Sequence, residues 1–274
     1  MMLKNKTAAI YGGGGAIGGA VARAYADAGA RVYLAGRSRD RLEKVANDIG
    51  DAAGVAEVDA LDERAVAEHA DAVAADAGGI DIALNAVSFL VQNTAPLAEL
   101  AVDEFMHSID TYLRTNLITA KAVARHMTAR GSGTILTLST AASTFGRIGN
   151  LGFGTTCAAI EAMTQRLAVE LGPSGVRAVC LRPTGIEDAP AHGSFTGEQL
   201  APLAAAGGVS VEQMLAQWGQ DQTLLGRLPT LAQVADTAVF LASDRAGAIT
   251  GAVVDLTRGN AVRTNTGSLV GLLY

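Results

Sequence analysis

Seven short apolar runs are spaced along this chain, and an amphipathic helical pattern lies between most of them. Strands that alternate with helices are joined by right-handed crossovers and build a parallel sheet that helices cover on both faces. The sequence therefore predicts an α/β fold with a doubly wound, seven-stranded parallel sheet (Rossmann-like) and helices on both faces. The predicted strands are residues 7–12, 31–36, 54–59, 81–86, 133–139, 176–183 and 252–257.

The alternation breaks once, between Ile186 and Thr230, where Pro, Gly and two short helical patterns occur. This insertion follows the sixth strand, at the carboxyl end of the sheet, where open α/β folds bind their ligands. We expect residues 1–274 to form a single domain and residues 187–229 to form a lid over the active site. The Ala, Leu and Gly content of the lid, with Phe195 and Trp218, predicts a small and rather apolar substrate.

Composition limits the partners and the compartment. The formal net charge is −6, 18% of residues are charged and no basic run occurs, which argues against nucleic acid and against an anionic membrane as partners. Two cysteines are too few for a disulfide framework, and the chain starts without the pattern of a secretory signal. No run of 18 apolar residues occurs, so we expect a cytoplasmic protein.

A glycine-rich turn, "YGGGGAIGG", joins the first predicted strand to the first helix. Glycines allow a tight turn and a close approach of the backbone to a pyrophosphate, whose charge the N–H groups of the helix start then meet. The alternative is a tight strand-to-helix turn that binds nothing. The residues predicted to bind a dinucleotide here are Gly12, Gly14, Gly15, Ala16, Ile17 and Gly18.

The end of the second strand predicts which dinucleotide binds. An Asp or Glu there would accept hydrogen bonds from a ribose 2′-hydroxyl, but the chain has Gly36, Arg37 and Ser38. Arg37 and Ser38 favour the 2′-phosphate of NADP(H). The alternative is that Arg37 and Arg39 are solvated charges at a helix start, a place that disfavours cations unless an anion is near. Further cofactor contacts are predicted for Asp59 at the adenine and for Asn85 and Ala86 at its ribose.

Several motifs in order resemble the short-chain dehydrogenase/reductase family from about Lys6 to Asn260. The family's nucleotide loop appears as Tyr11 to Gly18, and its Asn-Asn-Ala-Gly motif as "LNAV", which retains Asn85 and Ala86. Asn116 matches the family's helix asparagine, "RPTG" with Pro183 replaces the usual Pro-Gly, and "AITGAVVDLTRG" matches the segment near the end. The resemblance implies an oxidoreductase that binds a nicotinamide cofactor, with Pro183 among the cofactor contacts.

The catalytic positions depart from the family. Its Ser orients a carbonyl, its Tyr gives a proton, and a Lys four residues later lowers the pKa of that Tyr. The spacing places Thr140 at the Ser position, with Ser139 adjacent, Phe153 at the Tyr position and Cys157 at the Lys position. No lysine follows Lys121 and no tyrosine lies between residues 112 and 274, so a shift of register restores neither residue. The alternative reading is that Phe153 is a packed aromatic residue and Cys157 a small buried one.

Other side chains are candidates for the proton transfer that Phe153 and Cys157 do not provide. Cys157 as a nucleophile lacks an adjacent base, whereas His192, Glu187 and Asp188 follow the sixth strand, where a titratable lid residue can reach a substrate. Tyr274 is a further candidate near an active site. No spacing of His, Asp or Glu predicts a metal site. The candidate catalytic residues are Asn116, Ser139, Thr140, Phe153, Cys157 and His192.

These patterns predict an atypical oxidoreductase that uses NADP(H) to exchange hydride with a small iminium, enone or quinone-like compound, without the usual Tyr/Lys relay. Two alternatives stay open: a non-redox enzyme, such as a cyclase or dehydratase, and a cofactor-binding protein without turnover. Helical patterns at about 103–130 and 150–171 match family helices that pair across a two-fold axis, so we expect a homodimer or homotetramer.

Overall fold

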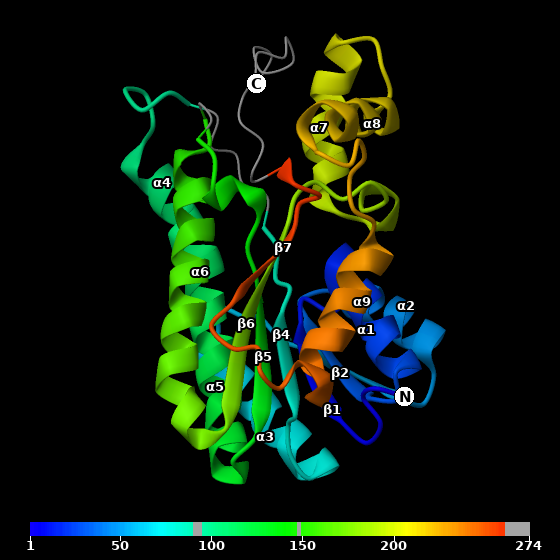
Figure 1. The fold of residues 1–274 in the computed structure, drawn as a ribbon, viewed down its shortest axis with the longest axis vertical. Coiled ribbons are helices and arrows are strands. Elements are labelled where there is room, and N and C mark those ends of the chain that lie inside the picture. The colour runs from blue at the N-terminus through cyan, green and yellow to red at the C-terminus, as the bar shows by residue number, and fades with distance from the viewer. Residues whose placement is uncertain (90–94, 147–148, 261–274) are drawn as a thin grey trace.

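One seven-stranded parallel sheet organises the chain (Figure 1). The structure is a computed structural model that describes residues 1–89, 95–146 and 149–260. The strand order is β3-β2-β1-β4-β5-β6-β7, so the chain reverses its direction of winding between β1 and β4. The strands are β1 (Thr7–Tyr11), β2 (Arg31–Gly36), β3 (Ala53–Glu57), β4 (Ile82–Asn85), β5 (Gly133–Leu138), β6 (Val176–Pro183) and β7 (Val253–Leu256). The predicted doubly wound α/β fold is confirmed.

Helices cover both faces of the sheet, and the two faces form separate apolar layers. Successive residues of a strand point to opposite faces, so Ala8 and Ile10 belong to one layer while Ala9 and Tyr11 belong to the other. The first layer lies under α1 (Ala16–Asp27), α2 (Arg39–Ile49) and α9 (Leu231–Ala242). The second lies under α3 (Glu63–Ala77), α5 (Arg114–Arg130) and α6 (Leu151–Leu171).

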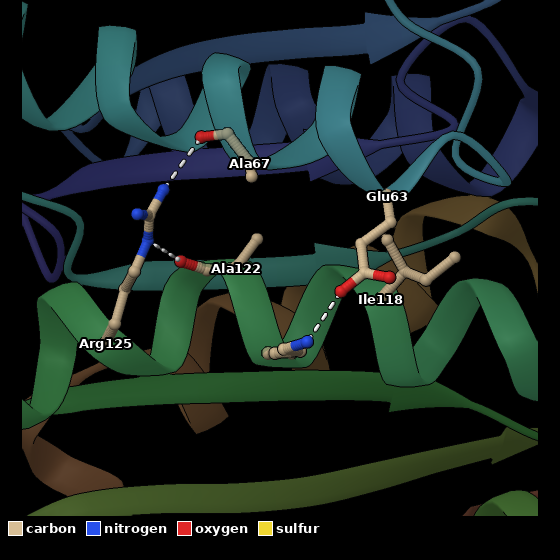
Figure 2. Close-up of a pocket in the computed structure, with 6 residues that line it drawn as sticks. Glu63, Ala67, Ile118, Ala122 and Arg125 are labelled. Carbon is tan, nitrogen blue, oxygen red and sulfur yellow. Dashed lines mark hydrogen bonds and ion pairs between the residues drawn. The ribbon is translucent and has the colours of Figure 1, made fainter.

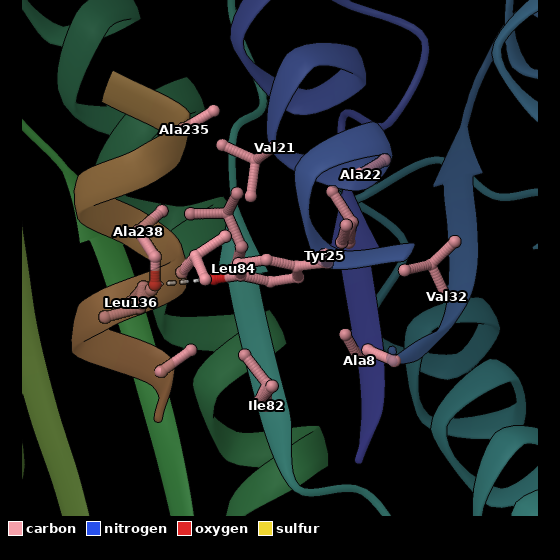
Figure 3. Packing of buried hydrophobic residues seen from close by; sticks show 14 of the residues in the cluster. Ala8, Val21, Ala22, Tyr25, Val32, Ile82, Leu84, Leu136, Ala235 and Ala238 are labelled. Carbon is pink, nitrogen blue, oxygen red and sulfur yellow. Dashed lines mark hydrogen bonds between the residues drawn. The ribbon is translucent and has the colours of Figure 1, made fainter. Parts of the chain in front are cut away.

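Small side chains bring α1 and α9 close together over the centre of the sheet. Figure 3 shows Val21 and Tyr25 of α1 facing Ala235 and Ala238 of α9, with Leu84 and Leu136 of the strands close by. The Tyr25 side chain is fully buried, and its hydroxyl donates a 3.4 Å hydrogen bond to the Ala238 carbonyl oxygen. This packing holds α1 rigidly against the end of β1, where the glycine turn begins.

The break in the alternation contains two helices, as expected. They are α7 (Phe195–Ala206) and α8 (Val211–Gln222), and both lie beyond the carboxyl ends of the strands (Figure 1). Ser210 begins α8 with a reciprocal pair of hydrogen bonds to Gln213. None of the helices in the described part of the chain has the length and apolar composition needed to cross a bilayer.

One predicted boundary was wrong, and one predicted helix contains an unexpected turn. The chain is helical from Val102 to Arg130, close to the expected 103–130, but α4 (Val102–Ser108) and α5 are joined by one π-helical turn at Ile109–Leu113, where the Thr111 hydroxyl bonds the carbonyl oxygen of His107. The third strand ends at Glu57 rather than at Asp59. The Asp59 carboxylate instead accepts a 3.0 Å hydrogen bond from the Leu61 N–H and forms a turn before α3.

The core packing can be tested with two matched substitutions. Leu84 is fully buried in the centre of the sheet, and Leu97 is 77% exposed. Leu84→Ala should lower the free energy of unfolding by about 2–5 kcal/mol, because it removes buried methyl groups and leaves a cavity. Leu97→Ala should change it by about 0.5 kcal/mol or less. Urea unfolding followed by circular dichroism measures both, and equal losses would contradict this packing.

Candidate active site

The glycine turn is closely packed at the start of α1. Gly12 has a φ of +81°, and a Cβ there would lie 2.5 Å from the carbonyl oxygen of Ala86 at the end of β4. A Cβ at Gly18 would collide with the carbonyl oxygen of Gly12. Gly15 caps α1 without a side-chain hydrogen bond, so the first N–H groups of the helix face outward. This turn therefore fits an anionic group such as a pyrophosphate.

The predicted dinucleotide residues of the turn lie together, as the sequence implied. Gly12, Gly14 and Gly15 form the turn itself, and Ala16, Ile17 and Gly18 form the first turn of α1. Ala16 and Ile17 also pack against an apolar cluster made by the start of α9 and the segment after β6. The base of the lid region and the start of α1 are thus held in one rigid unit.

Arginines after β2 have different surroundings. Arg39 pairs with Glu43 one turn along α2 at 2.7 Å, and Arg41 donates to the carbonyl oxygen of Gly193. The guanidinium of Arg37 instead lies over the ring of Phe89, 5.2 Å from its centroid. Ser38 begins α2 without a side-chain capping bond. Arg37, after β2, and Phe89, after β4, therefore meet across the carboxyl end of β1, where the glycine turn begins.

Asn85 has a structural position at the end of β4. Its amide donates to the Thr119 hydroxyl at 3.0 Å and its carbonyl oxygen accepts from the Val87 N–H at 3.0 Å. These bonds fix the path of the chain from β4 past Ala86 to Phe89. Asp59 lies exposed in the turn after β3. A role for these residues in contacting an adenine or a ribose remains a prediction.

Thr140 and Cys157 meet beside the carboxyl end of β5. The Thr140 hydroxyl lies 3.5 Å from the Cys157 sulfur and accepts a hydrogen bond from the Ala142 N–H. Cys157 is buried on α6, and burial raises the pKa of its thiol to about 11. The thiol is therefore neutral at ordinary pH, which argues against Cys157 as a nucleophile. The buried position agrees with the alternative reading of this residue as a small packed side chain.

A carboxylate that the sequence reading missed lies one turn beyond Cys157. Glu161 accepts hydrogen bonds from Ser139 at 2.7 Å and from Ser143 at 2.6 Å. Arg182 of β6 pairs with Glu161 at 3.3 Å and with Asp255 of β7 at 3.0 Å. Ser139 is therefore engaged by Glu161 and lies apart from the Thr140–Cys157 contact. The i, i+4 spacing from Cys157 was the signal that could have identified Glu161.

Tyr112 is the second residue that the sequence reading missed. Its ring packs edge to face against Phe153, with centroids 5.8 Å apart, and against Phe89, with centroids 5.6 Å apart. Its hydroxyl donates to the Phe89 carbonyl oxygen at 2.6 Å and accepts from the Phe89 N–H at 3.0 Å. Tyr112 lies in the π-helical turn, a feature frequent at functional sites. Its position one turn before Asn116 was the available signal.

Asn116 has one buried polar atom left over. Its amide nitrogen donates to the Tyr112 carbonyl oxygen at 2.8 Å, while its side-chain oxygen has no partner among the described residues. A buried acceptor of this kind normally has a donor. A bound molecule that donates a hydrogen bond could complete the partners of this oxygen.

The candidate residues in the segment after β6 have separate surroundings. His192 is exposed in a short helical turn, Pro190–His192, and Glu187 is exposed after β6. The Asp188 carboxylate accepts a 2.9 Å hydrogen bond from the Leu231 N–H at the start of α9. Trp218 of α8 packs on Gly185, where a Cβ would lie 2.6 Å from the indole ring. Pro183 ends β6, and Tyr274 lies outside the described residues.

A separate shallow pocket lies away from the crevice, between α3 and α5 (Figure 2). Its polar side chains are engaged with each other or with backbone: Lys121 pairs with Glu63 at 2.6 Å, and Arg125 donates to the Ala67 carbonyl oxygen at 3.0 Å. The pocket thus offers charges that are already neutralised. In the described ranges, no group of three or more His, Cys, Asp and Glu residues could hold a metal ion.

Comparisons with known proteins agree with this architecture. The profile of the family described as enoyl-(acyl carrier protein) reductase matches residues 14–260. A cis-4-hydroxycyclohexanecarboxylate dehydrogenase from Sinomonas cyclohexanicum is 29% identical over 256 residues, which cover 93% of this chain and 96% of the relative. A D-threitol dehydrogenase from Mycolicibacterium smegmatis is 28% identical, with 95% of each chain covered.

Solved structures with the same fold include relatives above 25% identity. A gluconate 5-dehydrogenase from Burkholderia cenocepacia J2315, solved in complex with NADP and tartrate, superposes with a TM-score of 0.82 at 26% identity, covering 96% of this chain and 97% of the other. A short-chain type dehydrogenase/reductase from Mycobacterium ulcerans gives a TM-score of 0.82 at 26% identity, covering 96% and 92%. From its sequence matches and its sheet alike, the chain belongs to the short-chain dehydrogenase/reductase family and is an oxidoreductase of that family.

Proposed function

We propose that this oxidoreductase uses NADP(H) to transfer hydride to a small, rather apolar electrophile, such as an iminium ion, an enone or a quinone, without the family's Tyr/Lys relay. The observation that carries the proposal is the combination of a tight glycine turn at an uncapped helix start with Phe153 and Cys157 at the two relay positions. The cofactor would supply the hydride, and the protein would supply binding, orientation and exclusion of water.

The residues present fit a dinucleotide. Side chains at Gly12 and Gly18 would collide with backbone carbonyl oxygens, so the tight turn requires glycine, and no side chain caps the first N–H groups of α1. We assign the pyrophosphate to this turn. Arg37 and Ser38 would hold a 2′-phosphate, because a guanidinium and a hydroxyl both donate hydrogen bonds to phosphate oxygens. The relative from Burkholderia cenocepacia that was solved with NADP supports this choice of cofactor.

The chemistry of the relay positions supports an activated substrate. Phe153 has no proton to give, and the neutral Cys157 thiol supplies no positive charge to lower the pKa of a neighbouring acid. Arg182, which contacts Glu161 one turn beyond Cys157, is already paired with Glu161 and Asp255. General acid catalysis contributes about 10²–10⁴-fold to such reactions, so substrates that accept hydride readily suit this site best.

Substrate selection is assigned to the region 187–229. We propose that α7 and α8 form a lid over the crevice, because they lie beyond the carboxyl ends of the strands (Figure 1). Arg41 of α2 contacts Gly193, which ties the beginning of this region to the cofactor side of the crevice. The apolar residues of the lid favour an apolar substrate.

The choice of cofactor can be tested at Arg37. Arg37→Ala should weaken NADPH binding by about 1–3 kcal/mol, because a charge-assisted contact to the 2′-phosphate is lost. NADH binding should be almost unchanged. Arg39→Ala is the matched control, since Arg39 is paired with Glu43. Nicotinamide fluorescence titration measures all four affinities, and equal losses for NADPH and NADH would contradict the assignment.

The reaction class can be tested with a panel of electrophiles. We expect the protein to bind NADPH and to oxidise it with phenanthrenequinone, cyclohexenone and an N-methyl dihydroisoquinolinium ion faster than with cyclohexanone, which depends most on acid catalysis. Absorbance of NADPH and product analysis give both rates. Product formed without oxidation of NADPH would instead indicate a non-redox enzyme, and binding without turnover a non-catalytic protein.

The assembly is a further part of the proposal. Leu117 of α5 and Leu151 and Val169 of α6 are 55%, 47% and 75% exposed, so these helices present apolar side chains outward. Pairing of such faces across a two-fold axis would cover them. We therefore expect a homodimer or homotetramer in sedimentation at micromolar concentration. Leu117→Lys should shift the distribution toward smaller species, and a monomeric wild-type protein would contradict the proposal.

A further inference from the structure

A row of rings crosses the crevice from the end of β2 to α6. It begins with the guanidinium of Arg37, 5.2 Å from the ring centroid of Phe89, and continues through Tyr112 to Phe153 with centroid separations of 5.6 and 5.8 Å. We call these four side chains the aromatic row. Tyr112 is the one ring of the row that carries a hydroxyl group, and it touches the ring at the relay position.

Tyr112 is joined to the other candidate groups through its ring and its backbone. Phe153 is one helical turn before Cys157, which contacts Thr140, and Asn116 bonds the Tyr112 backbone through its side chain. The hydroxyl proton is directed at the Phe89 carbonyl oxygen, which belongs to the segment after β4 rather than to a helix or strand. A substrate oxygen can therefore replace this carbonyl as the acceptor without breaking regular secondary structure.

We infer that Tyr112 is the general acid of this protein, a catalytic residue supplied by the π-helical turn in place of the residue absent at position 153. The inference rests on the hydride transfer proposed above and goes beyond it, because it names the group that protonates the substrate. It also gives the π-helical turn a purpose: the wider turn sets the Tyr112 ring against Phe153.

The step balances as a two-electron reduction. The electrophilic carbon of a quinone or enone accepts hydride from NADPH, and the π-electron pair moves to the carbonyl oxygen. The O–H bond of Tyr112 breaks as its proton passes to that oxygen, which forms a new O–H bond. The substrate is reduced, NADPH is oxidised to NADP⁺, and the Tyr112 phenolate takes a proton from water.

The surroundings of Tyr112 favour reduction over oxidation. Burial raises the pKa of Tyr112 above its usual value, and Cys157 on α6 adds to the increase, while Ser88 and Phe89 act in the opposite direction. Arg37, on the other side of Phe89, is the charged member of the row. A raised pKa keeps the phenol protonated, the form that a reduction needs, from neutral into alkaline pH. The oxidation of an alcohol needs the phenolate and is disfavoured at the same pH.

Other proton donors in the described residues are less suited. Glu161 is already engaged by Ser139, Ser143 and Arg182. His192 is exposed on the lid. The other tyrosines in the described ranges lie elsewhere: Tyr11 is buried with its hydroxyl 3.3 Å from Nδ1 of His69, Tyr25 lies in the core with α9, and Tyr33 is bonded to Asp76.

The test compares two substrates in the Tyr112→Phe protein. This variant removes only the hydroxyl and retains the ring of the aromatic row. Single-turnover reduction of phenanthrenequinone by bound NADPH should fall by about 10²–10⁴-fold, the usual contribution of a general acid. Reduction of an N-methyl dihydroisoquinolinium ion should be unchanged, because an iminium ion becomes a neutral amine by accepting hydride alone. NADPH affinity should also be unchanged.

A matched control and a second measurement accompany the rates. Tyr33→Phe removes a hydroxyl that bonds Asp76 at 2.5 Å, away from the crevice, and should leave both reductions as in the wild type. The chain has five tyrosines, so NMR of protein labelled at tyrosine Cζ can assign the Tyr112 signal by its loss in Tyr112→Phe. Phenanthrenequinone added without NADPH should shift that signal.

Three outcomes would overturn the inference. Equal quinone reduction by the wild type and Tyr112→Phe would show that another group gives the proton, while the hydride transfer itself would stand. Equal losses with the quinone and the iminium ion, together with an unmoved Tyr112 signal, would indicate a structural role. A wild-type protein that oxidises NADPH with neither compound would remove the proposed function, and the inference with it.

Discussion

The close approach of two backbones at the switch between β1 and β4 is the constraint on which the rest of the structure depends. Gly12 turns the chain out of β1 with a positive φ, directly against the carbonyl group of Ala86 at the end of β4. The crevice opens at this point because the crossovers from the two neighbouring strands run to opposite faces of the sheet. A side chain at Gly12 would separate the strands and displace the start of α1.

Helix α6 organises the other side of the crevice, and three residues at successive turns have different environments. Phe153 packs on Tyr112, Cys157 contacts Thr140, and Glu161 accepts two hydroxyl hydrogen bonds and an ion pair. The charged group is thus the one whose partners are complete, as buried carboxylates require. The uncharged positions nearer the crevice are apolar or weakly acidic, which gives the site a low polarity compatible with apolar electrophiles.

The segment after β4 links the two ends of the crevice. Asn85 holds this segment at its start through Thr119 and Val87, and Phe89 meets both Arg37 and Tyr112. A ligand that contacts Arg37 would therefore bear on Phe89, and through it on Tyr112. Phe89 thus contacts both the residue after β2 and the π-helical turn.

Much of the fold could be predicted because hydrophobic periodicity and glycine placement are local properties. The runs at 31–36 and 176–183 match β2 and β6 residue for residue, and α6 begins within one residue of the expected start. The interruption at Ile109–Leu113 could not be predicted, since a helical pattern does not distinguish a π-helical turn from an α-helical one. The end of β3 also depended on a side-chain bond, from Asp59 to Leu61, that competes with the strand.

The sequence by itself determined the alternation of strands and helices, the glycine turn, the absence of lysine after residue 121 and the identity of Phe153 and Cys157. Family membership followed from motifs in order along the chain. Only the tertiary structure decided that Tyr112 lies against Phe153, that Glu161 holds Ser139, and that Arg37 lies over Phe89. These pairs are 41, 22 and 52 residues apart in sequence. Contacts between residues so far apart are set by how the helices and the segment after β4 pack on the sheet, which no local pattern specifies.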